Sequence, residues 1–208
     1  RDIPLSFAAG YPDVRRLPLR QVRRLFARCT APDQCSNLVY SPPGGHPQLR
    51  EELWRYLADR GIERRDDIDI LVTNGAQHGL DIFARTFVKE TGAVAVESPT
   101  YYGALAAFRI SGFDQVPVPQ DAQGLSINAL AALCRENRFD FLYTNPTFNN
   151  PSGMTLSVAR RKSLVRLARQ HDFAILEDDT YSDLGFTGAR LPSLMTLAED
   201  IPVFRIGS

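Results

Sequence analysis

Lysine is scarce in this 208-residue chain, where Lys89 and Lys162 stand beside 22 arginines. An excess of one charge is also missing, because the 24 basic residues are matched by 24 acidic ones. Nucleic acids and anionic membrane surfaces are bound by basic patches, so this balance argues against both as partners of the segment. Apolar runs long enough for a membrane-spanning helix do not occur either, and none is predicted.

Cysteine and histidine are equally few, with three of each and no spacing typical of a metal site. We therefore predict no bound metal and free thiols, as in a reducing cytoplasm. No signal-peptide pattern follows Arg1. These absences favour a cytoplasmic protein whose chemistry depends on neither metals nor disulfides.

What the chain does contain is an alternation of short apolar runs, rich in β-branched residues, with longer helical patterns. This alternation is typical of crossover units, in which a helix links two parallel strands that are buried on both faces. The pattern predicts an α/β fold of three layers, with helices on both faces of a mostly parallel sheet. Strands are expected over 68–73, 93–97, 114–118, 141–144, 173–177 and 203–206, and helices over 19–28, 46–60, 76–88, 102–111, 127–137 and 157–171.

Polar or glycine-containing motifs follow five of the expected strands, directly after Thr73, Glu97, Thr144, Glu177 and Ile206. Parallel strands end at one edge of a sheet, and ligands of such sheets bind beyond that edge. The motifs are therefore expected to meet there. Their shared placement predicts a binding site without reference to any other protein.

Two of the motifs indicate what this edge binds. In residues 73–77 (TNGAQ), a glycine at a helix start permits a tight turn, and the free N–H groups of the first turn suit a phosphate. In residues 177–181 (EDDTY), three acids end a strand, and a buried carboxylate is costly unless it meets a cation. Taken singly, each motif has a plain alternative: a strand–helix turn for the first and a solvated acidic loop for the second.

Together with residues 99–101 (PTY) and 149–153 (NNPSG), these motifs resemble the fold-type I pyridoxal-phosphate enzymes of the class I/II aminotransferase family. The resemblance spans residues 5–208, with the motifs in the same order and at consistent spacing. The nearest branches are the aminoadipate-type transaminases and the aminotransferase-like domain of MocR-type regulators. The resemblance implies pyridoxal 5′-phosphate as cofactor, an amino acid and a 2-oxo acid as substrates, and a homodimer.

The resemblance also assigns roles to single residues. Asp178 would pair with the protonated ring nitrogen of the cofactor, which keeps the ring able to accept electrons. Tyr101 would stack on the ring, and Asn150 and Tyr181 would bind its phenolic oxygen.

Further matches concern the phosphate and the substrate. The phosphate would be held by four positions of one subunit, Gly75, Ala76, Gln77 and Ser208. Two looser matches are Tyr40, which would reach the phosphate of the neighbouring subunit, and Gly10, which would lie near the substrate. A surface turn is an equally good interpretation of both.

In the family, the lysine that holds the cofactor follows in Gly-Ser-x-x-Lys, three residues after the position of Ser208, and neither Lys89 nor Lys162 matches it. We therefore expect a chain cut just before its catalytic lysine, which would bind pyridoxal phosphate weakly at best. Residues 1–45 are expected to form an N-terminal arm and helix that belong to the small domain and the dimer contacts. Residues 46–208 are expected to form the large, cofactor-binding domain.

Two functions remain open at this point. The full-length protein is expected to be a pyridoxal-phosphate-dependent aminotransferase, or to carry this segment as the effector domain of a MocR/GntR-type transcription regulator. Residues 1–208 do not separate the two, because both share the cofactor site. A winged-helix domain upstream of Arg1 would mark the regulator, and only then would nucleic acid become a partner.

Overall fold

The computed structural model describes residues 13–31, 38–87, 89–186, 190–198 and 200–208. The chain divides into two units, Arg1–Gly44 and Gly45–Ser208. The described part of the first unit contains the short 3-10 helix η1 (Val14–Arg16) and the helix α1 (Leu19–Cys29), and neither has a buried residue. The hydrophobic core therefore lies in the second unit.

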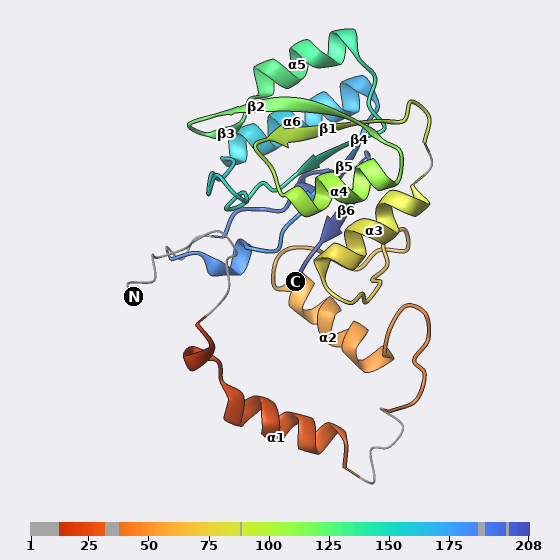
Figure 1. Ribbon diagram of the computed structural model, residues 1–208, viewed down its shortest axis with the longest axis vertical. Coiled ribbons are helices and arrows are strands. Elements are labelled where there is room, and N and C mark those ends of the chain that lie inside the picture. Colours follow the sequence, from red (N-terminus) through yellow and green to blue (C-terminus); the bar gives the residue numbers. More distant parts are fainter. Residues whose placement is uncertain (1–12, 32–37, 88, 187–189, 199) are drawn as a thin grey trace, which may run out of the picture. The chain divides into compact units, whose positions relative to one another are not determined.

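The second unit is built on a six-stranded sheet with the strand order β3-β2-β1-β4-β5-β6 (Figure 1). Four neighbouring pairs are parallel, and only β2 and β3 pair antiparallel. The strands are β1 (Ala93–Ser98), β2 (Asp114–Asp121), β3 (Gly124–Leu125), β4 (Phe141–Thr144), β5 (Ala174–Asp178) and β6 (Val203–Ile206). The mostly parallel sheet confirms the predicted α/β class.

Helices cover both faces of this sheet. Successive residues of a strand point to opposite faces, so in β1 the side chain of Ala95 joins one core cluster and those of Val94 and Val96 join the other. The first cluster contains residues of α5 (Ile127–Glu136), α6 (Val158–His171) and α7 (Leu194–Leu197), and the second contains residues of α3 (Ala76–Thr86) and α4 (Tyr102–Ile110). The expected three layers are thereby confirmed. The helix α2 (Pro47–Ala58) and the 3-10 helix η3 (Ser182–Leu184) complete the described elements of this unit.

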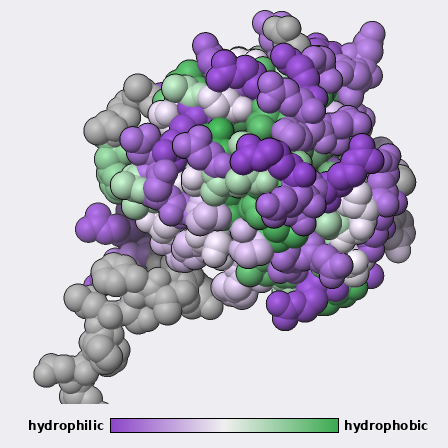
Figure 2. Space-filling model, turned by 90° about the horizontal axis from the view of Figure 1, so that it is seen from above, coloured by the Kyte–Doolittle hydropathy of each residue, from purple (hydrophilic) through white to green (hydrophobic). Residues whose placement is uncertain are grey.

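The outer surface of the helical layers is polar. Figure 2 views the molecule from the side on which α5 lies in Figure 1, and hydrophilic residues dominate that surface, with hydrophobic ones in small patches between them. This is the distribution expected of amphipathic helices over a buried sheet. Within the described ranges, no helix is long and apolar enough to cross a membrane.

The strand expected over 68–73 is wrong, because the structure has no ladder there. A strand is formed by hydrogen bonds to a neighbouring strand, and none of the described strands pairs with residues 68–73. Residues 68–73 therefore have a strand-like sequence but no hydrogen-bonded neighbour. The two-residue strand β3 was too short to give a pattern at all.

A serine begins the longest helix of the sheet's α5–α6 face. The Ser157 hydroxyl accepts a hydrogen bond from the Arg160 N–H at 3.3 Å and so caps α6. We expect Ser157→Ala to lower the free energy of unfolding by about 1 kcal/mol, because an orphan N–H is left without its acceptor. Urea unfolding measures the change, with Ser163→Ala in the interior of the same helix as the control. Equal values for the two variants would contradict the capping role.

Candidate functional site

Four of the five motifs found in the sequence follow strands of the sheet at one edge, and the fifth, residues 73–77, leads into α3, which packs near the end of β6. Strands β1, β4, β5 and β6 run parallel, and the chain leaves all four at their carboxyl ends into loops or helix starts. Register brings the ends of β5 and β6 together, because Asp178 is paired with Ile206. Residues that follow these strands can therefore act on one ligand.

Asp178, the last residue of β5, has the chemistry of a cation partner. Its side chain is buried, and Oδ2 accepts a hydrogen bond from the Tyr143 hydroxyl at 2.7 Å. Oδ1 is also buried but has no hydrogen-bond partner among the described residues. Burial raises the pKa of this carboxyl, against the lowering effects of the hydrogen bond from Tyr143 and of the nearby Thr180 hydroxyl and N–H. An orphaned, buried carboxylate oxygen is the acceptor that a cationic N–H group of a ligand would satisfy.

Asn150 and Tyr181 lie on the loops after β4 and β5 and meet there. The Asn150 side-chain amide donates to the Tyr181 hydroxyl at 3.2 Å. Both residues line a hollow of about 540 Å³, together with the apolar side chains of Phe148, Leu184 and Phe186. The amide and the hydroxyl are thus accessible, and together they can donate to one oxygen of a ligand.

Tyr101 stands at the start of α4, with its ring against the core cluster of α3 and α4. Gly103 makes room for it, since a Cβ at that position would come within 2.5 Å of the ring and would also meet the Gln77 side chain. The Gln77 amide donates to the Gly103 carbonyl at 3.0 Å, which links the starts of α3 and α4. Tyr102, by contrast, is exposed. The absence of a side chain at Gly103 therefore determines where the Tyr101 ring lies.

Gly75 begins α3 with φ of +85°, in the left-handed region that favours glycine. No side chain caps this helix start, and a Cβ at Gly75 would meet nothing within 4 Å. The N–H groups of the first turn, which include those of Ala76 and Gln77, therefore have no side-chain acceptor at the cap among the described residues. Gly79, one turn on, packs near the Ile206 side chain, so the end of β6 that leads to Ser208 lies beside α3. This geometry suits an anionic group such as a phosphate.

Two predicted residues are not placed at this edge. Tyr40 belongs to the first unit, and its side chain is fully exposed. Its predicted contact is with another copy of the chain and stays a prediction. Gly10 lies outside the described residues.

Sequence reasoning missed three polar residues beneath the site. Glu97, Tyr143 and Asn145 are buried and connected to the loops that carry the predicted residues. An acid at the end of an otherwise apolar strand was the available signal for Glu97. For Tyr143 the signal was its position two residues before Asn145, which puts both side chains on one face of the strand.

Glu97 has the most perturbed acid–base behaviour of these three. Burial raises the pKa of its carboxyl from the ordinary 4.5 to about 7, against the lowering effect of hydrogen bonds from Asn145 and Asn149. The carboxyl of Asp178 and the hydroxyl of Tyr143 are the titratable groups near it. Because Asp178 is itself acidic, it adds to the rise.

We expect the ionisation of Glu97 to lower stability as pH rises. The pKa of this carboxyl is higher in the folded state than in the unfolded state, so its contribution to the free energy of unfolding is complete below pH 4.5. That contribution is lost as the pH rises to about 7. At about 1.4 kcal/mol per pKa unit, the loss is about 3 kcal/mol. The test compares the free energy of unfolding of the wild type with that of Glu97→Gln at pH values from about 4 to about 8. A difference between the two that stays constant with pH would contradict the assignment.

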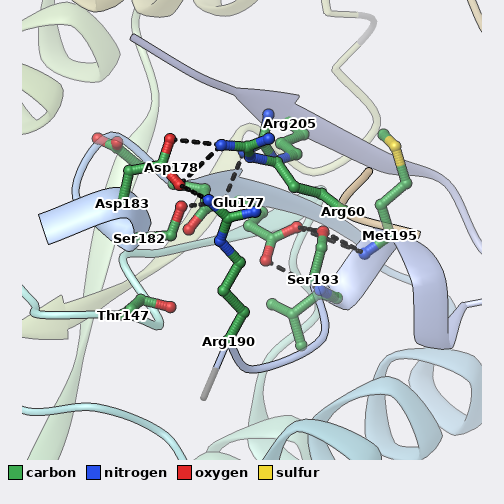
Figure 3. A network of polar contacts seen from close by, with 12 residues as sticks. Arg60, Thr147, Glu177, Asp178, Ser182, Asp183, Arg190, Ser193, Met195 and Arg205 are labelled. Carbon is green, nitrogen blue, oxygen red and sulfur yellow. Dashed lines mark hydrogen bonds and ion pairs between the residues drawn. The ribbon is translucent and has the colours of Figure 1, made fainter. Parts of the chain in front are cut away.

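A second group of charged residues forms ion pairs around η3, next to the site. Arg60 donates to both oxygens of Asp183 in η3, at 2.9 and 2.7 Å, and Arg190 lies 3.2 Å from the same carboxylate (Figure 3). Arg205 of β6 forms a largely buried ion pair with Asp179 at 2.6 Å. Each of these guanidinium groups already has a carboxylate partner. We therefore interpret the group as structural support for η3 and for the ends of β5 and β6.

Glu177, one residue before Asp178, points to the other face and has a structural role. Its carboxylate accepts hydrogen bonds from the Ser193 hydroxyl and from the Leu194 N–H at the start of α7 (Figure 3). Arg161, itself buried, lies 4.0 Å away. Of the acids in the 177–181 motif, Asp178 is thus the one with a buried oxygen that lacks a hydrogen bond among the described residues.

The chain is similar to known proteins of one family. The family described as aminotransferase class I and II matches residues 3–208. The chain is 34% identical over 196 residues to 2-aminoadipate transaminase of Thermus thermophilus, with 94% of this chain and 48% of that protein covered. The crystal structure of LysN, alpha-aminoadipate aminotransferase from the same species, complexed with N-(5'-phosphopyridoxyl)-L-leucine, has a TM-score of 0.85 and 32% identity, with 97% of this chain and 51% of that chain covered.

Transcription regulators are similar to the chain as well. The HTH-type transcriptional regulator YjiR of Escherichia coli (strain K12) is 32% identical over 183 residues, which cover 88% of this chain and 38% of that protein. The chain spans about half of the two aminotransferases and less of the regulator.

Proposed function

The chain belongs to the aminotransferase class I and II family, and on this basis we propose that the whole protein is a pyridoxal-phosphate-dependent aminotransferase. It would transfer amino groups between an amino acid and a 2-oxo acid. The observation that carries the proposal is the buried, unpartnered Oδ1 of Asp178 at the edge where Asn150 and Tyr181 meet. A protonated pyridine ring is a cation that fits such an oxygen, so the residues present fit this cofactor.

Four residues would hold the ring. When bound, pyridoxal phosphate supplies an electron sink for the charge left when a proton leaves the α-carbon of the substrate. Asp178 would keep a proton on the ring nitrogen, and Asn150 and Tyr181 would bind the phenolic oxygen. Tyr101 would cover one face of the ring and exclude water from it.

The phosphate would bind at the start of α3. The N–H groups of the first turn, at Ala76 and Gln77, and the positive end of the helix dipole favour an anion there. Gly75 gives the chain the conformation that leaves this space open. Ser208, two residues beyond the end of β6, would add its hydroxyl.

The base that moves the α-proton would be a lysine three residues after Ser208 in the whole protein. Lys89 does not fit this role, because its ammonium group donates to the Ser111 carbonyl and lies 4.6 Å from the centre of the Phe113 ring. Both contacts are near the beginning of β2, at the opposite edge of the sheet. Lys162 is exposed on α6.

The activity test uses the whole protein with pyridoxal phosphate, one amino-acid donor and one 2-oxo acid acceptor. We expect the new amino acid to form in equal amount to the 2-oxo acid released from the donor. Parallel lines in double-reciprocal plots would show that the amino group rests on the protein between two half-reactions. No transfer across a panel of common amino acids, although the cofactor is bound, would overturn the proposal.

A second candidate is a regulator whose cofactor site senses a ligand, and it is favoured by the similarity to YjiR. It predicts cofactor binding without amino transfer, together with binding of the whole protein to specific DNA. The transfer assay and a DNA-binding assay on the same preparation separate the two. For either function we propose a cytoplasmic homodimer, in which Tyr40 reaches the phosphate of the neighbouring subunit.

A further inference from the structure

Glu97 is a buried acid that the proposed chemistry does not use. It lies near the end of β1 and is only 2% exposed. Its Oε2 accepts hydrogen bonds from the Asn145 backbone N–H at 2.9 Å and from the Asn149 side-chain amide at 2.6 Å. The carboxylate therefore connects β1 to two positions in the first part of the loop that follows β4.

Asn145 passes this connection on to two of the proposed cofactor residues. Its side-chain oxygen accepts a hydrogen bond from the Asn150 N–H at 2.8 Å, and its side-chain amide donates to the Asp178 carbonyl. Asn145 is itself buried, so its side chain has few alternative conformations. The chain of contacts thus runs from Glu97 through Asn145 to Asn150 on one loop and to Asp178 on β5.

Asn149 holds a second position of the same loop. Its side-chain oxygen accepts hydrogen bonds from the Ser152 hydroxyl at 2.8 Å and from the Ser152 N–H at 3.3 Å. With its amide bound to Glu97, the Asn149 side chain holds the turn on the far side of Asn150. Asn150 is therefore held from both sides by groups that bind Glu97.

Retaining an acid at this position has an energetic disadvantage. Burial raises the pKa of Glu97, so that its ionised form is destabilised near neutral pH, and the nearby Asp178 carboxyl adds to the effect. An apolar side chain would avoid this disadvantage, but it would accept neither hydrogen bond. The contacts with the loop are what the acid provides.

We propose that Glu97 is a positioning residue, which acts through Asn145 and Asn149 to set the placement of Asn150 relative to Asp178. These two side chains would contact two different groups of one ring, the nitrogen and the phenolic oxygen, so their spacing decides how well the ring is bound. The inference rests on the proposed cofactor site, but the hydrogen-bonded connection is a property of the chain alone.

The first experiment measures amide hydrogen exchange in the cofactor-free chain. Glu97→Gln keeps a side-chain oxygen that can accept both hydrogen bonds, whereas Glu97→Asp withdraws the carboxyl by one methylene and Glu97→Ala removes it. We expect exchange at Asn145 and Asn150 to be faster by about tenfold or more in the Asp and Ala variants and nearly unchanged in the Gln variant. The Leu130 amide in α5, which donates to the Ser126 carbonyl, is the internal reference.

The second experiment measures the affinity and absorbance maximum of pyridoxal phosphate for the same variants. We expect the Asp and Ala variants to bind about tenfold more weakly, with a shifted absorbance maximum, and the Gln variant to match the wild type. If the Ala variant does not fold, the Asp variant carries the test.

Two results would overturn the inference. One is faster exchange that is equal at Leu130, Asn145 and Asn150, because a general loss of stability would explain it. The other is unchanged affinity and absorbance in a folded Asp or Ala variant. A wild-type chain that binds no cofactor would instead overturn the proposed function, and the exchange experiment would still decide the role of Glu97.

Discussion

Replacing Asp178 with asparagine is expected to weaken the binding of pyridoxal phosphate by about 100- to 1,000-fold, because one partner of a buried charge pair is lost. The asparagine oxygen can still accept the hydrogen bond from Tyr143. Its NH₂ group would then face the ring N–H, which places two donors opposite each other. The cofactor-free variant should be at least as stable as the wild type, because burial already disfavours the charged form of Asp178.

Titration of the chain with pyridoxal phosphate, followed by absorbance, measures this loss. The matched control is Asp121→Asn, which removes an exposed acid paired with Arg160 at the end of β2 and should leave the affinity unchanged. Thermal unfolding of both variants without cofactor shows whether they are folded. Equal affinities of Asp178→Asn and the wild type would remove Asp178 from the proposed site.

Replacing Arg161 with leucine is expected to lower the free energy of unfolding by about 3–5 kcal/mol, which is the range observed when one partner of a buried ion pair is removed. The guanidinium group is 1% exposed and donates to the carbonyls of Leu156, Pro146 and Pro192 at 3.0, 2.8 and 3.1 Å. It also donates to the Thr147 hydroxyl at 2.7 Å. Leucine would leave the Leu156 and Pro192 carbonyls without this donor, and it would remove the cation that lies 4.0 Å from the Glu177 carboxylate.

Arg166→Leu is the control for this prediction, because Arg166 lies on the same helix and is exposed. Its replacement should change stability by no more than about 0.5 kcal/mol. Urea unfolding of both variants gives the comparison. A loss below about 1 kcal/mol for Arg161→Leu would mean that the contacts of the guanidinium group contribute little to stability.

The sheet could be predicted because its strands are buried on both faces. Strands β4 and β5 are buried along their whole length, and each begins with a run of apolar residues, as is typical of central parallel strands. The expected strand over 68–73 was wrong because a strand depends on pairing with a segment elsewhere in the chain, which no local pattern contains, and no described strand pairs with these residues.

The buried polar connections could not be predicted in the same way. In the sequence, Arg161 is one of 22 arginines and stands next to Arg160. Of these two neighbours, Arg161 is buried and Arg160 is not. Glu97 likewise reads as a solvated acid at a strand end. Which polar side chain points inward depends on contacts with residues about 50 positions away, such as Asn145 and Asn149.

The most direct measurement of the site is a crystal structure of the chain with bound pyridoxal phosphate. We expect the ring nitrogen to lie at hydrogen-bonding distance, about 3 Å, from Oδ1 of Asp178. The phosphate should lie at the first turn of α3, within reach of Ser208. A cofactor found elsewhere, for example attached to Lys89 or Lys162, with Oδ1 of Asp178 still without a partner, would contradict the account.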